Sequence, residues 1–387
     1  MNIGVDIRCL MDKQRTGVGE YTYGLLDAVF KIDRENQYFL FYNSYKDVSE
    51  ILPKWSHPNV HYARTRWPNK CFNAILLLNL IKLDNLVIKK LFTNYKLQIK
   101  NLDVWFSPNL NFTSLTSKVK FILTIHDLSF EFLSECYTLK QRLWHKLLMP
   151  KKQCERADII LTPSESTARD VAATYGIDRE KVNVCYPGVS TIITQNTINI
   201  TQLREEYDLP EKFILFLGTI EPRKNVEAVI GAFAMAYDLG LRTYGLVITG
   251  AKGWKNKDVF QMIVNTPNVR YIDYVAEEDK SALYQMASLF VYPSLYEGFG
   301  LPVLEAMASG TPVITSNRSS LPEVGGDAVY YVNPTNAAEL SEAMARILRD
   351  DELGIMNYEL RIERQRELVK KFDWERSAKE FLLLIHI

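Results

Sequence analysis

The sequence predicts an α/β fold of two domains, each built on a parallel sheet, and three observations support this prediction. At 387 residues the chain is too long for one ordinary hydrophobic core, so two domains of roughly 190 residues each are expected. Short apolar runs alternate with stretches of helical spacing throughout, which is typical of parallel sheets. This alternation is interrupted at 187–210 by a polar, weakly periodic stretch, which we interpret as an interdomain linker.

Composition and charge are those expected of a globular protein in a reducing compartment. Hydrophobic residues make up 47% and charged residues 24% of the chain, as in globular proteins. The net charge is zero, yet residues 1–190 hold 26 basic against 19 acidic residues and the remainder 20 against 27, so the two halves should meet different partners. Five scattered cysteines indicate a reducing compartment and no metal cluster. A signal-peptide pattern is lacking, and so is any run of about 20 apolar residues, which predicts a cytoplasmic location.

The first half alternates strand and helix from its first residues. Its expected strands are 2–7, 38–42, 103–108, 120–125, 159–162 and 182–186, and its expected helices are 20–30, 137–157 and 164–175. The loop before the first helix carries Gly17 and Gly19, which form either a tight turn or a loop whose backbone approaches a substrate. This loop is not the dinucleotide-binding fingerprint, because Thr22 stands where a third Gly or Ala is required. A hydride-transfer enzyme is therefore a poor fit.

His126 is the first candidate site residue, and it ends the expected strand 120–125. The carboxyl ends of parallel strands face the crevice in which open α/β sheets bind ligands. A lone histidine is more often structural, but this position favours a functional role.

The segment 64–100 combines basic and apolar residues. It holds eight basic residues and a single acid, Asp84, with leucine, isoleucine and aromatic residues between them. Basic, apolar helices of this kind can lie on an anionic membrane surface. The alternative interpretation is that the apolar face belongs to the domain core and the lysines to its solvated face. Both interpretations stay open from the sequence.

The second half repeats the alternation. Its expected strands are 213–217, 244–249, 269–272, 288–294, 312–315 and 328–332, and its expected helices are 226–237, 279–287, 301–310, 336–349, 351–369 and 372–387. The loop after the first of these strands places Arg223 and Lys224 side by side at a strand end. Such a pair is commonly a surface feature, but Pro222 stiffens this loop, and Arg and Lys together suit phosphate oxygens.

The most informative stretch runs from Glu297 to Glu305, with the sequence EGFGLPVLE. It follows an expected strand and opens an expected helix, so it presents free backbone N–H groups and the positive helix end to an anion. Glu305 lies about one turn into that helix and can face the same crevice as Glu297. A glycine loop alone is a weak signal, because many helix starts need glycine only for close packing.

Four motifs in this order resemble the retaining family 4 glycosyltransferases. They are GTIEPRKN at 218–225, PSLYEGFGLPVLE at 293–305, GTPV at 310–313 and LPEV at 321–324. The resemblance covers essentially the whole chain. It implies the GT-B fold, with two facing Rossmann-like domains that have parallel sheets. The implied domains are an acceptor domain at 1–190, a nucleotide-sugar donor domain at 191–371, and a helix at 372–387 that crosses back to the first domain.

The resemblance also implies roles for the charged residues of the second half. Arg223 and Lys224 match the basic pair that holds the donor diphosphate. Glu305 matches the carboxylate that binds the nucleotide ribose, and Glu297 matches the one near the sugar or its leaving phosphate. No Asp-x-Asp triplet occurs in the chain, so we expect no metal, with the basic pair and the helix start in its place.

Further contacts with the donor are implied from both halves of the chain. The backbone of Gly298, Phe299 and Gly300 matches the loop that contacts the sugar hydroxyls, Leu301 lies beside the phosphate, and the base is expected near Val275. In the first half, His126 matches a histidine near the donor sugar. Gly17 and Gly19 match the glycine loop near phosphate and acceptor.

The identity of the substrates is less closely determined. The EPRKN version of the motif and the loop at 252–254 resemble bacterial mannosyltransferases that use GDP-mannose to build O-antigen or capsule chains. UDP-glucose, UDP-N-acetylhexosamine and dTDP-rhamnose stay open as donors. The expected acceptor is a saccharide or a lipid-linked saccharide, with membrane-surface contact through 64–100 and no nucleic-acid partner.

Two rival functions belong to other classes. A GT-B nucleotide-sugar epimerase would convert the donor without any acceptor. A non-catalytic partner in a polysaccharide assembly complex would tolerate loss of Glu297 without any effect on transfer.

Overall fold

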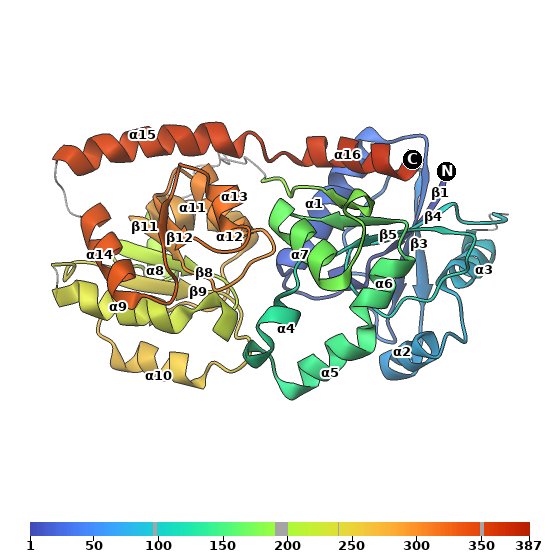
Figure 1. Ribbon diagram of the computed structural model, residues 1–387, viewed down its shortest axis with the longest axis horizontal. Helices are drawn as coiled ribbons and strands as arrows, with labels where there is room; N and C mark the ends of the chain where they lie inside the picture. Colours follow the sequence, from blue (N-terminus) through green and yellow to red (C-terminus); the bar gives the residue numbers. More distant parts are fainter. Residues whose placement is uncertain (96–98, 190–199, 239, 349–351) are drawn as a thin grey trace. The chain divides into compact units, whose positions relative to one another are not determined.

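The computed structural model describes residues 1–95, 99–189, 200–238, 240–348 and 352–387, and these fall into two units (Figure 1). Unit 1 comprises Met1–Leu128, Lys140–Gly188 and Asp373–Ile387, and unit 2 comprises Ser129–Leu139 and Val189–Phe372. Much of the expected linker, at 190–199, lies outside the described residues.

Unit 1 is built on a seven-stranded sheet whose neighbouring strands are all parallel, in the order β3-β2-β1-β4-β5-β6-β7. The strands are β1 (Asn2–Asp6), β2 (Gln37–Asn43), β3 (Val60–Thr65), β4 (Val104–Ser107), β5 (Lys120–Thr124), β6 (Ile159–Thr162) and β7 (Val182–Val184). The order along the sheet reverses between β1 and β4. Parallel strands need crossover connections, and those of unit 1 are mainly helical.

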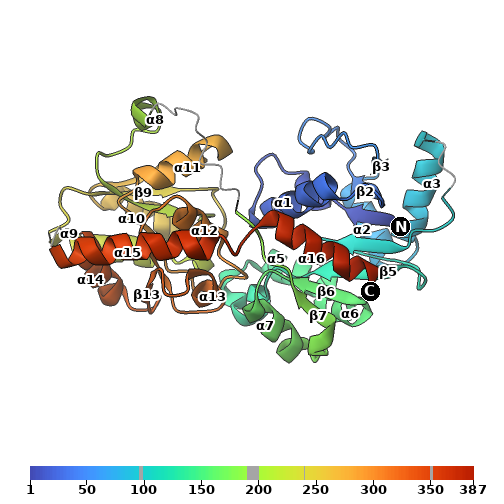
Figure 2. The same cartoon turned by 90° about the horizontal axis from the view of Figure 1, so that it is seen from above.

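The helices of unit 1 come from both ends of the chain. They are α1 (Gly17–Ile32), α2 (Asn69–Leu77), α3 (Leu83–Tyr95), α5 (Leu139–Leu148), α6 (Pro150–Arg156), α7 (Glu165–Tyr175) and α16 (Trp374–His386), with short 3-10 turns η1 (Arg8–Leu10) and η3 (Arg179–Lys181). Figure 2 shows α16 lying along α1, and the two helices pack together. The carboxyl-terminal helix therefore returns to the unit that contains the amino terminus, as predicted.

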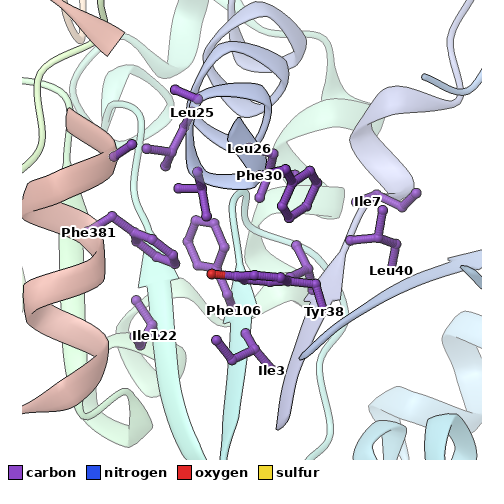
Figure 3. Close-up of a cluster of buried hydrophobic side chains, with 14 of the residues drawn as sticks. Ile3, Ile7, Leu25, Leu26, Phe30, Tyr38, Leu40, Phe106, Ile122 and Phe381 are labelled. Carbon is purple, nitrogen blue, oxygen red and sulfur yellow. The ribbon is translucent and has the colours of Figure 1, made fainter. Parts of the chain in front are cut away.

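The core of unit 1 explains why α16 docks there. Phe381 of α16 is fully buried and packs on Phe106 of β4 with ring centroids 4.7 Å apart (Figure 3). Leu25 and Leu26 of α1 are also fully buried in this cluster. Burying each such side chain contributes about 1.5–3 kcal/mol, so this apolar face anchors the helix strongly.

Unit 2 has a six-stranded parallel sheet in the order β10-β9-β8-β11-β12-β13, which reverses between β8 and β11. The strands are β8 (Phe213–Leu217), β9 (Gly245–Thr249), β10 (Val269–Tyr271), β11 (Leu289–Tyr292), β12 (Val313–Ser316) and β13 (Tyr330–Val332). The longer helices are α8 (Ile200–Glu206), α9 (Val226–Asp238), α10 (Lys257–Asn265), α11 (Glu277–Met286), α12 (Leu301–Ala308), α14 (Ala337–Leu348) and α15 (Glu352–Val369). The short elements are α4 (Ser129–Phe132), η2 (Ser134–Cys136), η4 (Pro222–Lys224) and α13 (Leu321–Gly325).

Two local expectations were wrong, and one strand was missed. Helix α1 begins at Gly17 instead of residue 20, because Thr16 is extended and glycine is tolerated in a first turn whose N–H groups need no helical partner. The single helix expected at 137–157 is two helices, since Met149 adopts a left-handed conformation and Pro150 starts α6. Strand β3 was not predicted.

The segment Ser129–Leu139, which follows β5 in the first half of the sequence and begins with α4, packs with unit 2. The indole Nε1 of Trp254 donates to the carbonyl of Cys136 at 2.7 Å, and the Trp254 ring stacks on Tyr137 with centroids 5.8 Å apart. Phe132 packs on Tyr296 with centroids 5.6 Å apart. These contacts assign to unit 2 a segment that the expected boundary at residue 190 placed in the first domain.

Among the described residues, no helix has the length and apolar character that crossing a membrane requires.

Candidate active site

The candidate site of unit 2 lies where its strand order reverses. Strands β8 and β11 are neighbours in the sheet, and the loops after their carboxyl ends carry Arg223 and Lys224 in one case and Glu297 in the other. In open α/β sheets such a reversal opens a crevice in which ligands bind, because the two connections leave to opposite faces. The topology thus brings Glu297 next to Arg223 and Lys224, which lie 74 and 73 positions earlier in the sequence.

These three residues form one ion-pair network. Arg223 donates from Nη1 to Glu297 at 2.9 Å and from Nη2 to Glu221 at 2.7 Å. Lys224 donates from Nζ to the other oxygen of Glu297 at 2.7 Å, and also to the hydroxyl of Tyr292. Two cations and two carboxylates therefore meet with no net charge, and Glu297 is shared by both cations.

Burial makes this network strong. Burial alone would raise the pKa of Glu297, but the charges of Arg223 and Lys224 outweigh that effect and lower the pKa to about 2. Burial lowers the pKa of Lys224, and the negative charge of Glu297 opposes that change. Removing one partner of a buried ion pair costs about 3–5 kcal/mol, because the remaining charge is left without compensation.

The loop from Glu297 to Gly300 is held by two serines that follow β12. The hydroxyl of Ser319 accepts the N–H of Glu297 at 2.8 Å. The buried hydroxyl of Ser320 lies 2.9 Å from the carbonyl of Glu297 and 2.7 Å from that of Phe299, and it donates to this pair. These bonds fix the backbone of the predicted sugar-binding loop independently of any ligand.

Helix α12 begins at Leu301, immediately after this loop. Gly300 has φ of +116°, and a Cβ at this position would lie 2.7 Å from a methyl carbon of Leu321. Only glycine suits this conformation and this space. The positive end of α12 therefore lies next to Glu297 in the sequence, and anion binding by this loop stays a prediction.

Glu305 and Val275 occupy neighbouring parts of unit 2. Glu305 lies in the second turn of α12 and accepts a hydrogen bond from the hydroxyl of Tyr284 on α11 at 2.9 Å. Val275 is buried in the connection that leads into α11. Their predicted contacts with the nucleotide ribose and base stay predictions.

The other predicted residues belong to unit 1. Nε2 of His126 lies 2.7 Å from the carbonyl of Pro108, so Nε2 carries a proton that it donates. Burial lowers the pKa of His126, which favours the neutral imidazole, and its ring packs edge-on against Tyr21. Gly17 and Gly19 lie in the first turn of α1. The structure thus groups Arg223, Lys224 and Glu297 in one network of unit 2. It places His126, Gly17 and Gly19 in unit 1.

Sequence reasoning missed several residues that support the site. Glu221 stands in the same motif as Arg223, and its carboxylate was the available signal. Tyr292 and Tyr284 occur in apolar runs that predict only core, so nothing local marks their hydroxyls as partners of Lys224 and Glu305. The assignment of Glu297 to the sugar or its leaving phosphate did not include its bonds to both cations.

The arrangement suits stabilisation of negative charge. The side chains of Arg223 and Lys224 remain 12% and 11% exposed, so they are not fully enclosed by the protein. Carboxylates hold both cations in place before any substrate arrives. Charges that need no reorganisation during a reaction are the most effective electrostatic catalysts, and one such donor is worth about 10²–10³ in rate.

Comparison with known proteins identifies the family. The Glycosyltransferase Family 4 model matches residues 17–192, and the model for glycosyl transferases group 1 matches residues 199–364. O-antigen chain mannosyltransferase B of Escherichia coli is 31% identical over 264 residues, which is 67% of this chain and 68% of that protein. The chain belongs to the family 4 glycosyltransferases. This enzyme class was predicted from the four motifs, and the prediction is confirmed.

Other relatives are similar over smaller parts. O-antigen chain mannosyltransferase RfbU of Salmonella typhimurium is 30% identical over 58% of this chain and 60% of that protein. The serotype-specific mannosyltransferase WbdA of Escherichia coli is 33% identical over 51% of this chain and 25% of its own length.

Solved structures confirm the GT-B fold of this glycosyltransferase. HepE of Anabaena, in complex with UDP and glucose, has a TM-score of 0.70 at 16% identity and covers 99% of both chains. WaaG, a glycosyltransferase involved in lipopolysaccharide biosynthesis, has a TM-score of 0.69 at 15% identity and covers 99% of both chains.

Proposed function

We propose that this glycosyltransferase transfers mannose from GDP-mannose to a saccharide or lipid-linked saccharide acceptor in the synthesis of a cell-surface polysaccharide. The reaction retains the anomeric configuration and requires no metal. One observation carries the proposal: Arg223 and Lys224 are both held by Glu297, and Arg223 also by Glu221, beside the loop that opens α12. Fixed cations of this kind suit the diphosphate of a nucleotide sugar.

In the proposed reaction the bond between the sugar C1 and the diphosphate oxygen breaks as the acceptor hydroxyl attacks. The new C1–O bond forms on the face that the diphosphate leaves, and the hydroxyl proton passes to a leaving phosphate oxygen. Negative charge grows on the diphosphate, where Arg223 supplies a planar fork and Lys224 a compact charge. Glu297 holds both cations in this geometry. In this reaction the acceptor hydroxyl is the only nucleophile. Glu297 and Glu305 do not act as the pair of catalytic carboxylates that glycosidases use.

The choice of mannose rests on the relatives. Three of the similar proteins are named mannosyltransferases, and two of these are named for the O-antigen chain. The complex of HepE with UDP-glucose keeps a uridine donor as the leading alternative, although that similarity concerns the fold. UDP-N-acetylhexosamine and dTDP-rhamnose are further alternatives.

The proposed setting is the cytoplasmic face of the inner membrane, reached through residues 64–100. In this segment α2 and α3 bury Phe72, Leu76, Val87 and Leu91 in unit 1, which supports the core interpretation for one face. Leu78 and Leu80 are 66% and 69% exposed, which supports surface contact by the connection between the helices. Liposome binding that weakens with salt and on charge reversal at Lys89 and Lys90 is expected.

The first experiment is calorimetric titration of GDP-mannose, UDP-glucose and dTDP-rhamnose with EDTA present. We expect GDP-mannose to bind in the absence of metal and the other two to bind at least tenfold more weakly. Preferential binding of another donor would overturn the mannose assignment, and a requirement for a divalent cation would overturn metal independence.

The mechanism is tested by substituting the cations. Arg223→Ala and Lys224→Ala should each lower kcat on the order of 10²–10³-fold. Arg223→Lys should recover only part of that loss, because lysine keeps the charge but not the planar fork. The matched control is Arg270→Ala, which removes an exposed arginine of the same unit that pairs with Asp208 and should leave kcat unchanged. Near-normal turnover of Arg223→Ala and Lys224→Ala in folded protein would remove the phosphate assignment.

A further inference from the structure

Unit 1 contains a pocket of about 370 Å³ that the proposed transfer does not use. It lies between the end of α2, the chain around residues 112–115, and the junction of α5 with α6. Figure 1 shows α2 and α5 along the lower edge of unit 1. A volume of this size falls within the range of small-molecule sites, roughly 300–1,000 Å³.

The walls of the pocket are mainly apolar. Leu76 and Leu77 contribute from α2, Phe112 from the connection after β4, and Leu147 and Leu148 from α5. The break between α5 and α6 at Met149 ends the wall formed by α5. An apolar cavity open to the surface favours an alkyl chain over a polar ligand.

Basic side chains line the pocket together with the apolar ones. Lys82, Lys152 and Arg156 line the same pocket, and among its lining residues in the described chain none is acidic. Lys82 donates to the side-chain oxygen of Asn79 at 2.6 Å, and Arg156 donates to two backbone carbonyls and pairs with Asp158 at 3.4 Å. Among the described residues no carboxylate pairs with Lys82 or Lys152, so their positive charges stay uncompensated within the pocket. The charge of the pocket is therefore complementary to an anionic group.

The surface beside the pocket has the same mixed character. Six large apolar side chains are exposed there: Leu78, Leu80, Leu143, Trp144, Leu147 and Met149. Residues 139–156 hold six basic residues and a single acid, Glu155. Exposed apolar residues within a basic surface are typical of contact with an anionic membrane, because lysine and arginine can keep their charges at the level of the headgroups.

We propose that this pocket binds one amphiphilic anion of a membrane, with its alkyl chain between α2 and α5 and its phosphate at Lys82 and Lys152. The site is formed mainly by three segments that are separate in the sequence, 76–82, 112–115 and 147–156. The proposal goes beyond the transfer reaction and shares with it only the membrane contact of residues 64–100.

The test uses dodecyl phosphate as the probe, titrated below its critical micelle concentration and followed by calorimetry. We expect saturable binding of one molecule per chain, with no binding of inorganic phosphate and at least tenfold weaker binding of neutral dodecyl maltoside. Trp144 packs on Phe112 with ring centroids 4.8 Å apart, so its fluorescence should change on binding and that change should be lost in Trp144→Phe. Equal binding of the neutral amphiphile would overturn the phosphate part of the site.

Neighbouring lysines provide a matched pair of variants. Lys152→Glu should weaken binding of dodecyl phosphate at least tenfold, whereas Lys151→Glu should change it less than twofold, because Lys152 lines the pocket and the exposed Lys151 does not. Leu77→Trp, which fills the pocket, should abolish saturable binding. Equal effects of the two lysine variants would reduce the site to general surface charge and overturn the proposal.

A second arm places the anion in a bilayer. Vesicles of phosphatidylcholine with phosphatidylglycerol should bind the protein more tightly than vesicles of phosphatidylcholine alone, and Lys152→Glu should weaken this preference more than Lys151→Glu does. Binding of dodecyl phosphate without any vesicle preference would contradict a membrane source. Arg223→Ala should lose transfer and keep the dodecyl phosphate site, so failure of this proposal is distinguishable from failure of the proposed transfer.

Discussion

The two units reverse strand order at equivalent points, β1/β4 in unit 1 and β8/β11 in unit 2, but each point holds a different kind of ion pair. After β1, Arg8 pairs with Asp6 at 2.5 Å within one short segment, and it also donates to the carbonyl of Phe112, in the connection after β4, at 2.9 Å. After β8 and β11, Arg223 pairs with a carboxylate 74 positions away. In unit 1 both charges lie in one turn, and the neighbouring loop contributes only a neutral carbonyl. In unit 2 the carboxylate of Glu297 and the two cations come from different loops, so the ion pairs themselves tie those loops together.

Gly300 of unit 2 and Gly17 of unit 1 also differ, because folding requires a glycine at only one of these two positions. Gly300 adopts φ of +116° in a loop whose backbone is bound by Ser319 and Ser320. Gly17 has no positive φ, and a Cβ there would meet nothing within 4 Å. Folding therefore requires glycine at position 300 but not at position 17. A glycine that folding does not require is available for close approach of a ligand, as the family resemblance implies for Gly17.

The largest effect that would test this comparison is expected from Glu297→Ala. It leaves buried Lys224 without its carboxylate, so the free energy of unfolding of unit 2 should fall by about 3–5 kcal/mol. Denaturant titration followed by circular dichroism measures this change. The control is Asp327→Ala, which breaks an exposed pair with Arg364 and should cost less than about 1 kcal/mol. A similarly small loss for Glu297→Ala would mean that the network does not tie the two loops together.

The contribution of the Glu297 carboxylate to the free energy of unfolding should depend on pH. The pKa of Glu297 is about 2 in the folded protein against 4.5 for the free side chain, so its contribution is fully present above pH 4.5 and is lost as the pH falls towards 2. That loss is on the order of 3 kcal/mol. Denaturant midpoints measured between pH 5 and 3 should decline less steeply in Glu297→Gln than in the native protein. Equal slopes would show that Glu297 does not carry this pH dependence.

Gly300→Ala is expected to have a smaller effect. It combines an unfavourable positive φ with a Cβ contact of 2.7 Å to Leu321, so the free energy of unfolding should fall by about 1–3 kcal/mol. Thermal and denaturant unfolding measure this loss. Unchanged stability would mean that the loop can adopt another conformation, and the argument that it is held ready for a ligand would then fail.

Gly17→Ala should have the smallest effect on stability and thereby sharpens the comparison. Its methyl group meets no neighbour, and alanine favours the first turn of α1, so stability should be unchanged or rise by less than about 1 kcal/mol. Transfer should nevertheless fall, on the order of 10²-fold if the methyl group displaces the substrate by about 1 Å. Full transfer activity in this variant would return Gly17 to the role of a turn residue.

Much of the architecture followed from local pattern. Alternating apolar runs and helical spacing predicted two parallel sheets, and the motif that contains Arg223 and Lys224 predicted the candidate site together with the family. The strands and helices can be predicted because side-chain burial in each of them repeats at a short period along the chain. The start of α1 and the break at Met149 were missed, because first-turn glycines and a single left-handed residue leave no periodic signal.

The fold class, the enzyme family and the residue types of the site follow from the sequence alone. Three features become visible only in the folded chain: Glu297 is shared by Arg223 and Lys224, Ser129–Leu139 packs with unit 2, and α2 and α5 line the same pocket. The physical reason is common to all three. Each depends on contacts between segments that are distant in the chain, and the spacing of residues along one segment carries no information about the partner that folding brings to it.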